Sequence, residues 1–150
     1  MTQVKDKTDQ QLNQALAELV GYSVVKYRMP PDPDGSNWSF DYYMLVNCEG
    51  IPVETGLETE EEAWAETLDY CNDPAASLEV QAKAIADNKL IYLNALLSLV
   101  SPGEDIQFGL GGSMEVVGYN IDGTSAMLTA SPRERAEAAY ITLQGAKGNG

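Results

Sequence analysis

The chain has 150 residues, 44% of them hydrophobic, and a formal net charge of −14 with no histidine. This length and composition predict one domain, residues 1–150, with a core of its own, so the acidity does not indicate disorder. The negative charge makes nucleic acids and anionic membranes poor direct partners. Without histidine, Ser-His-Asp and Cys-His catalysis and the commonest zinc sites are excluded.

A helix is predicted near the start of the chain. Thr8 and Gln11 have the spacing of a capping box, in which each side chain pairs with the backbone N–H of the other residue. Leucines and alanines then recur at helical intervals as far as Gly21, a residue type that commonly ends helices. The sequence therefore predicts a first amphipathic helix that ends at this glycine.

Three strands are predicted next. Residues 22–28 are β-branched and aromatic, and residues 39–47 alternate between apolar and polar side chains. A turn at residues 47–50 leads to a third strand at residues 51–55, where Pro52 lacks an N–H and favours an edge position. The buried face of the middle strand is expected to consist of Phe40, Tyr42, Met44 and Val46.

The densest charge lies in residues 57–73, which predict one short helix with two different faces. Thr59 and Glu62 form a second capping-box pattern at its start. At about 100° per residue, Trp64, Leu68 and Cys71 fall on one stripe, which we expect to be buried. The opposite, exposed side carries Glu62, Glu66, Asp69 and Asp73.

A long helix is predicted after Pro74, over residues 77–100, with a bend near Asp87 and Asn88. Its apolar stripe consists of Leu78, Ala82, Ile85, Tyr92, Leu93 and Leu96. Three short strands are then expected at residues 106–110, 114–121 and 125–130, with a hairpin turn at Asp122-Gly123.

The final helix begins at a third capping box, formed by Ser131 and Glu134 around Pro132. Gly145 is expected to close this helix and to leave residues 145–150 as a frayed tail. Together the elements predict an α+β domain whose mainly antiparallel sheet is covered by helices, in the manner of an α/β/α sandwich.

Three stretches resemble the small bacteriophage proteins known as the phage ABA-sandwich domain. They are ALAELVGY at residues 15–22, a T-x-E-E-A-W helix start at residues 59–64, and residues 125–139, which end in Pro-Arg-x-Arg-x-x-A-A. The resemblance implies a phage or prophage origin and an α/β/α sandwich. It implies no activity, because the shared motifs are structural.

Charge is distributed unevenly along the chain. Residues 29–82 hold thirteen of the 23 acidic residues and none of the nine bases, whereas the remainder is nearly neutral. Ordinary protein surfaces intersperse both signs, so we weigh two interpretations of this segment, an interaction surface and a device for solubility.

Other chemistry has weak support in the sequence. The loop from Asp32 to Asn37 lacks ligands that a calcium loop needs, and the glycine loop from Gly109 to Ser113 lacks the Lys-Ser/Thr of a phosphate loop. Neither Cys48 nor Cys71 has a base nearby in sequence, and we expect both to be reduced thiols. Paired carboxylates are the one catalytic option that the sequence leaves open, but 23 acidic residues form many such pairs by chance. We therefore expect no enzyme, no cofactor and no metal site.

The leading hypothesis is a cytoplasmic, phage-encoded acidic protein that binds a basic host protein and inhibits it stoichiometrically. The target would be a nucleic-acid-binding defence complex, such as a CRISPR effector, which the carboxylates engage by mimicking nucleic acid. We expect neither direct nucleic-acid binding nor membrane binding, and the sequence leaves a homodimer open. The predicted partner-binding residues are Glu58, Glu60, Glu61, Glu62, Glu66, Asp69 and Asp73, with Trp64 and Leu68 in support.

Two alternatives belong to other classes. One is a binder of a small nucleotide signal, held near the glycine loop and Trp38; its phosphates would need cations from among Lys26, Arg28, Lys83, Lys89, Arg133 and Arg135. The other is a virion or assembly accessory protein.

Overall fold

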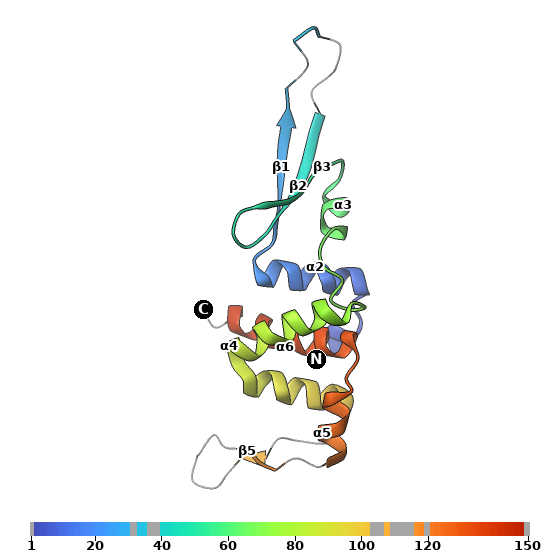
Figure 1. The fold of residues 1–150 in the computed structure, drawn as a ribbon, viewed down its shortest axis with the longest axis vertical. Helices are drawn as coiled ribbons and strands as arrows, with labels where there is room; N and C mark the ends of the chain where they lie inside the picture. The colour runs from blue at the N-terminus through green and yellow to red at the C-terminus, as the bar shows by residue number, and fades with distance from the viewer. Residues whose placement is uncertain are drawn as a thin grey trace.

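The three-stranded sheet lies at one end of an elongated molecule with one short helix beside it, and most of the helices lie below it (Figure 1). The computed structural model describes residues 2–30, 33–35, 40–102, 107–108, 116–118 and 121–148. The elements are α1 (Thr2–Lys5), α2 (Asp9–Val20), β1 (Ser23–Met29), β2 (Phe40–Val46), β3 (Pro52–Leu57), α3 (Glu60–Ala65), α4 (Pro74–Val100), β4 (Gln107–Phe108), β5 (Val116–Gly118), α5 (Ile121–Leu128) and α6 (Pro132–Gly148). The predicted α+β class, with an antiparallel sheet, is confirmed.

Helix α2 has both predicted caps. The Thr8 hydroxyl accepts from the Gln11 N–H while the Gln11 side chain accepts from the Thr8 N–H. Gly21 ends the helix in the left-handed conformation, with φ of 107°. A Cβ atom at Gly21 would lie 2.7 Å from the Cβ of Cys48, so glycine also lets the turn after β2 approach the end of α2.

The three long strands pair in the order β1-β2-β3, and Pro52 lies in the edge strand β3 as predicted. The predicted buried face of β2 is wrong. Leu45, on the opposite face, is fully buried in the core with Trp64, whereas Phe40 is 55% exposed. The reason is tertiary: α3 contacts all three strands, and the core forms on the Leu45 side.

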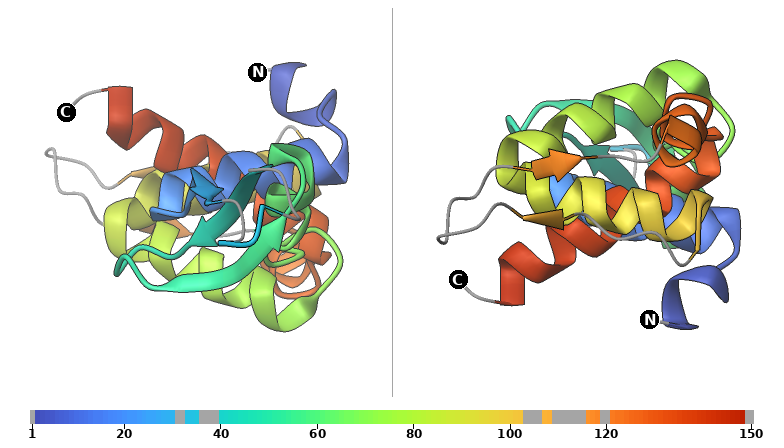
Figure 2. Two further views of the ribbon diagram at one scale, coloured as in Figure 1. Left: turned by 90° about the horizontal axis from the view of Figure 1, so that it is seen from above. Right: turned by 90° about the horizontal axis from the view of Figure 1, so that it is seen from below.

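Helix α4 folds back on itself at Asn88, where the predicted bend lies. Asn88 has non-helical backbone angles, and its side chain accepts from the Ile91 N–H to cap the second half. The Tyr92 hydroxyl donates to Gln81 at 2.7 Å, although eleven residues of straight helix would span about 16 Å. Both halves run across the long axis of the molecule (Figures 1 and 2).

The predicted stripe on the first half of α4 is only partly correct. Leu78, Ala82 and Ile85 are exposed, and the buried side carries Ala76, Ser77, Val80 and Ala84. Tyr92 and Leu96 in the second half are buried as predicted.

The segment after α4 differs most from the prediction. Residues 125–130 were expected to form a strand after a turn at Asp122-Gly123, but residues 121–128 form helix α5, which packs against α4. Asp122 lies in the first turn of α5, where a helix favours negative charge. Short strands β4 and β5 fall within the predicted runs at 106–110 and 114–121.

Helix α6 packs against α4 and α2 to form the middle of the core. Its predicted capping box is present, since Ser131 and Glu134 each accept from the other's backbone N–H. The helix passes Gly145 and continues to Gly148, so its predicted end was too early. No helix in the described part of the chain is long and apolar enough to cross a membrane.

Candidate functional site

Helix α3 presents the acidic residues at its start to solvent. The Thr59 hydroxyl accepts from the Glu62 N–H, as predicted. The Glu62 carboxylate accepts from the Glu58 N–H. The predicted donor was the N–H of the next residue, Thr59. Glu60 and Glu61 lie exposed in the first turn, and Trp64 beneath them is 8% exposed. Trp64 therefore anchors the helix as the sequence predicts.

The predicted helix over residues 57–73 is much shorter than expected. The helix ends at Ala65. After it, the backbone N–H groups of Glu66 and Thr67 donate to carbonyls three residues earlier instead of four. The Thr67 hydroxyl also donates to the Trp64 carbonyl. Leu68 is 37% exposed, so the prediction that it is buried on one stripe with Trp64 is wrong.

Asp69 and Asp73 consequently lie outside α3 and hold the chain that follows it. Asp69 accepts from the side chains of Asn13 and Asn72, at 2.9 and 3.1 Å. The Asp73 side chain caps α4 by accepting from the Ala75 N–H. Both carboxylates remain exposed, but neither belongs to the single helical face that the sequence predicts.

Ten exposed carboxylates in this part of the chain have no basic partner. Elsewhere, Asp9, Asp41 and Glu137 each form an ion pair with a described lysine or arginine. No described lysine or arginine forms an ion pair with an acidic residue between positions 49 and 79. The negative charge of these acidic residues is therefore not neutralised at contact distance. We call these ten residues the acidic surface: Glu49, Glu54, Glu58, Glu60, Glu61, Glu62, Glu66, Asp69, Asp73 and Glu79.

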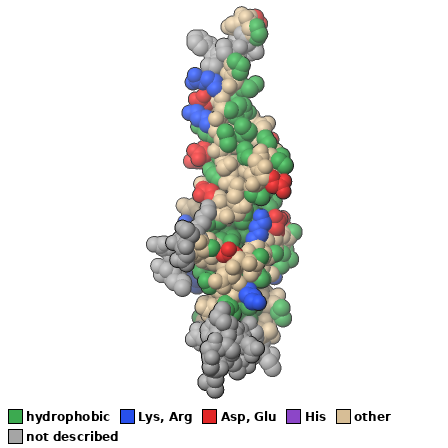
Figure 3. Space-filling model, turned by 90° about the vertical axis from the view of Figure 1, so that its left-hand side faces the viewer, with side chains coloured by type: hydrophobic (Ala, Val, Ile, Leu, Met, Phe, Trp, Pro, Cys, Tyr) green, Lys and Arg blue, Asp and Glu red, His purple; other side chains and the backbone are tan. Residues whose placement is uncertain are grey.

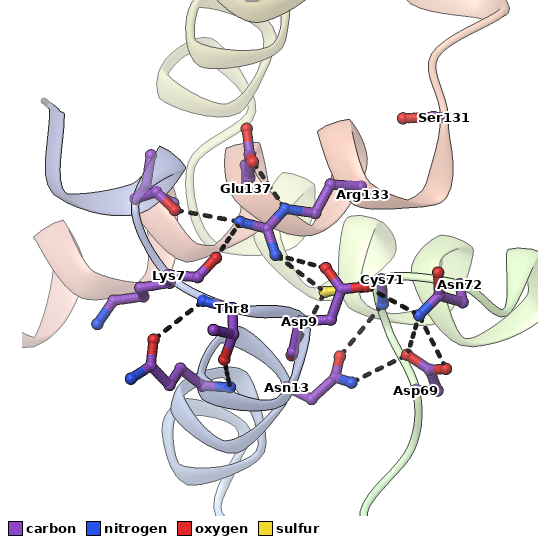
Figure 4. A network of polar contacts seen from close by, with 12 residues as sticks. Lys7, Thr8, Asp9, Asn13, Asp69, Cys71, Asn72, Ser131, Arg133 and Glu137 are labelled. Carbon is purple, nitrogen blue, oxygen red and sulfur yellow. Dashed lines mark hydrogen bonds and ion pairs between the residues drawn. The ribbon is translucent and has the colours of Figure 1, made fainter.

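Arg133 links α6 to the start of the chain (Figure 4). Its Nε donates to Glu137 at 2.7 Å, and its Nη1 donates to Asp9 at 2.8 Å. Its Nη2 donates to the backbone carbonyls of Lys7, at 2.7 Å, and Val4, at 3.3 Å. Because each guanidinium nitrogen has a protein acceptor, Arg133 has a structural role and is not free to bind phosphate.

The same network continues to the segment after α3 (Figure 4). The Cys71 N–H donates to the Asn13 side chain, and the Asn72 side chain donates to Asp9. Burial raises the pKa of the Cys71 thiol to about 11, although the nearby Arg133 lowers it. A thiol that is almost fully protonated at neutral pH is a poor nucleophile.

The other cations proposed for a nucleotide site do not converge in the described part of the chain. Lys26 and Arg28 both pair with Asp41 on the sheet. Arg135 lies on α6, where it donates to Ser77. Lys83 and Lys89 are exposed on α4. The glycine loop and Trp38 lie outside the described residues.

The structure has a cleft between α1, the second half of α4 and α6, which the sequence analysis did not predict. Its volume is about 370 Å³, and its lining includes Val4, Ile91, Leu99 and Ile141. Among the described residues that line the cleft, Lys5 is the only base, so these residues offer no cluster of cations for phosphates. The described residues also contain no group of three or more cysteines and acids arranged to hold a metal ion.

Comparisons with protein families, with curated proteins and with solved structures found no match for this chain. The resemblance to the phage ABA-sandwich domain therefore stays a prediction.

Proposed function

We propose that this protein acts by binding and not by catalysis, and that its acidic surface docks on a basic surface of another protein. The observation that carries this proposal is the set of ten exposed carboxylates that have no ion-pair partner among the described residues. Where the same chain places acids beside bases, as at Asp9 and Asp41, it forms ion pairs. An acidic surface without such neutralisation is free to pair with a partner's lysines and arginines.

The physics of exposed charge favours a partner with a concentrated positive patch. Each exposed ion pair contributes only about 0.2–1 kcal/mol, so affinity requires several pairs at once. Oppositely charged surfaces also attract at a distance and accelerate association. Proteins that bind nucleic acids present such patches because they neutralise phosphates.

In its finer form, the proposal is that a phage encodes this protein to inhibit a nucleic-acid-binding defence complex of its host. The carboxylates would occupy the positions of phosphates, so one bound copy would block the nucleic-acid site. The bacteriophage resemblance of the sequence supports this origin. The dispersed bases of the described residues give less support to the alternative of a nucleotide binder.

The test is an affinity pull-down from bacterial lysate with the immobilised protein, in the presence and absence of double-stranded DNA. A matched variant carries Glu60→Gln, Glu61→Gln and Glu66→Gln, three exposed carboxylates whose side chains make no hydrogen bond in the described structure. Glu62 and Asp69 are left unchanged because their carboxylates hold backbone or side-chain donors.

We expect the wild type to capture a nucleic-acid-binding protein that DNA displaces and that the triple variant captures poorly. Capture that DNA does not affect would contradict the mimicry. Equal capture by the triple variant would contradict the role of the acidic surface.

A further inference from the structure

A hollow lies between the two halves of α4 and helix α5, and Arg135 of α6 also lines it. Helix α5 lies toward the end of the molecule opposite the sheet (Figure 1). The volume of the hollow is about 380 Å³, within the range of about 300–1,000 Å³ that is usual for small-molecule sites. We call it the α5 hollow.

The apolar stripe that the sequence predicts for α4 faces the α5 hollow. Because α4 folds back at Asn88, the two halves of this stripe come together. The stripe residues that line the hollow are Leu78, Ile85, Tyr92, Leu93 and Leu96. Leu78 is 48% exposed, and Leu128 of α5, which also lines the hollow, is 77% exposed. Exposed apolar residues that gather on one concave surface are typical of a binding site.

Arg135 is the only charged residue in the described lining of the α5 hollow. It is half-buried, and its Nη1 donates to the Ser77 hydroxyl over a long distance of 3.4 Å. A guanidinium has five N–H donors, and no described carboxylate forms an ion pair with Arg135. The charge therefore has no counter-ion among the described residues, in a partly desolvated place where a counter-ion would stabilise it.

The other two arginines of the chain have carboxylate partners. Arg133 pairs with one acid of α2 and one of α6, and Arg28 pairs with Asp41 on the sheet. Basic and acidic side chains lie next to each other at the sheet end of the molecule (Figure 3). Arg135 thus differs from both other arginines, because it faces a hollow instead of a described carboxylate.

We propose that the α5 hollow binds a small molecule with an apolar body and one carboxylate group, and that this carboxylate pairs with Arg135. The chain has a net charge of −14, yet the described lining of the hollow carries one positive charge and no acid. An arginine holds a carboxylate through two parallel hydrogen bonds, and the leucines of the lining bury the apolar body. The single cation does not suit a nucleotide, because several phosphate charges would need several bases.

A hydrogen bond joins the two walls of the α5 hollow. The Tyr92 hydroxyl donates to Gln81 at 2.7 Å, and these two lining residues belong to opposite halves of α4. The bond fixes the spacing of the two halves, so a ligand does not have to order them when it binds.

The test is a titration of the full chain with sodium octanoate and with octan-1-ol, followed by methyl NMR. The buffer contains about 0.15 M NaCl, which screens the negative charge of the chain. The two probes share an alkyl chain, but only octanoate has a carboxylate. We expect octanoate to bind with a dissociation constant of about 1 mM or lower and to shift the methyl signals of Leu78, Ile85 and Leu128.

Arg135→Met should weaken octanoate binding at least about tenfold and change octanol binding by less than about twofold, because burial of the alkyl chain needs no cation. Lys83→Met removes the same charge from an exposed base of α4 and is the matched control. Leu78→Glu places a carboxylate in the lining, so it should also weaken octanoate more than octanol, and it decides the test if Arg135→Met does not fold. Its control is Ile91→Glu, at a residue of α4 that is 43% exposed and outside the described lining of the hollow.

A selective loss of octanoate binding in Arg135→Met or Leu78→Glu, with both controls unchanged, supports the proposal. A wild type that does not bind octanoate at about 10 mM overturns it. It is also overturned by shifts confined to residues outside the α5 hollow, or by a folded Arg135→Met variant that binds octanoate as the wild type does or loses both probes equally.

Discussion

At the scale of single residues, Arg133 connects parts of the chain that are far apart in sequence. It joins α6 to the carbonyls of residues 4 and 7 and to Asp9, at the start of α2. The side chain of Glu137, its other ion-pair partner, is only 10% exposed. Removing the arginine would leave that carboxylate and two backbone carbonyls with fewer donors, in a place where water replaces them poorly.

Arg133→Lys keeps the positive charge but loses the fork of donors, because one ammonium nitrogen cannot reach all four acceptors. We expect the free energy of unfolding in urea to fall by about 2–3 kcal/mol, because several of these partly buried acceptors lose their donor. Arg28→Lys, at an exposed ion pair with Asp41, is the control and should change stability by less than about 0.5 kcal/mol. A loss below about 1 kcal/mol for Arg133→Lys contradicts the structural role.

Asp69 should make the free energy of unfolding depend on pH in the acidic range. Desolvation raises the pKa of Asp69, but hydrogen bonds from Asn13 and Asn72 outweigh it, so the folded-state pKa lies below its ordinary value. A depressed pKa stabilises the folded protein above the unfolded-state pKa, and this contribution is lost as the pH falls through the folded-state pKa. Asp69→Asn should therefore be less stable than wild type at pH 7.

The difference in unfolding free energy between wild type and Asp69→Asn should narrow as the pH falls below about 4, the ordinary carboxyl pKa. Urea unfolding at pH 7, 4 and 2.5 measures it. Glu66→Gln, whose carboxylate makes no hydrogen bond in the described structure, is the control variant. A constant difference for Asp69→Asn across this range means that its carboxylate is not held by the two asparagines.

At the scale of elements, the short length of α3 gives Trp64 and Leu68 different environments. Trp64 and Leu68 are four residues apart, and both fall on the predicted apolar stripe. The helix stops between them at Ala65, so Trp64 enters the core and Leu68 does not.

Trp64→Ala should lower the free energy of unfolding by about 3–5 kcal/mol, because it leaves a cavity beneath α3. Leu68→Ala should lower it by less than about 1 kcal/mol, because Leu68 is already exposed to water. Chemical denaturation of both variants, followed by circular dichroism, measures the difference. Similar losses of unfolding free energy in the two variants would contradict the short helix and would favour the longer helix that the sequence predicts.

The elements that sequence analysis predicts well are those with local signals. The caps at Thr8 and Ser131 and the turn before Pro52 depend on residues within a few positions of one another, and all three are present. The errors depend on distant contacts. The buried face of β2 is set by α3, and residues 121–128 form a helix that packs on α4, although their glycine turn and short apolar run also fit a strand.

The candidate site divides in the same way. That residues 58–66 expose their carboxylates follows from the sequence, because charge and capping are local properties. That Asp69 belongs to a hydrogen-bond network depends on Asn13, 56 residues away. The role of Arg133 depends on residues more than 120 positions earlier, and periodicity carries no information at that distance.

At the scale of the whole molecule, charge is distributed unevenly. Residues 29–82 hold thirteen acidic residues and no lysine or arginine, and ten of these acids are exposed without an ion-pair partner among the described residues. The acidic surface is proposed to bind a basic partner, and salt should weaken that binding because it screens exposed charge.

The dissociation constant of the captured partner, measured between 0.05 and 0.5 M NaCl, tests the central claim most directly. The proteins compared are the wild type, the Glu60→Gln/Glu61→Gln/Glu66→Gln variant, and a control with Asp6→Asn, Glu18→Gln and Asp87→Asn, which removes the same charge elsewhere. We predict that wild-type affinity falls steeply with salt, that the first variant binds about ten- to a hundred-fold more weakly at low salt, and that the control matches the wild type. An affinity that salt does not change, or equal losses in the two variants, would contradict the claim that the acidic surface is the binding site.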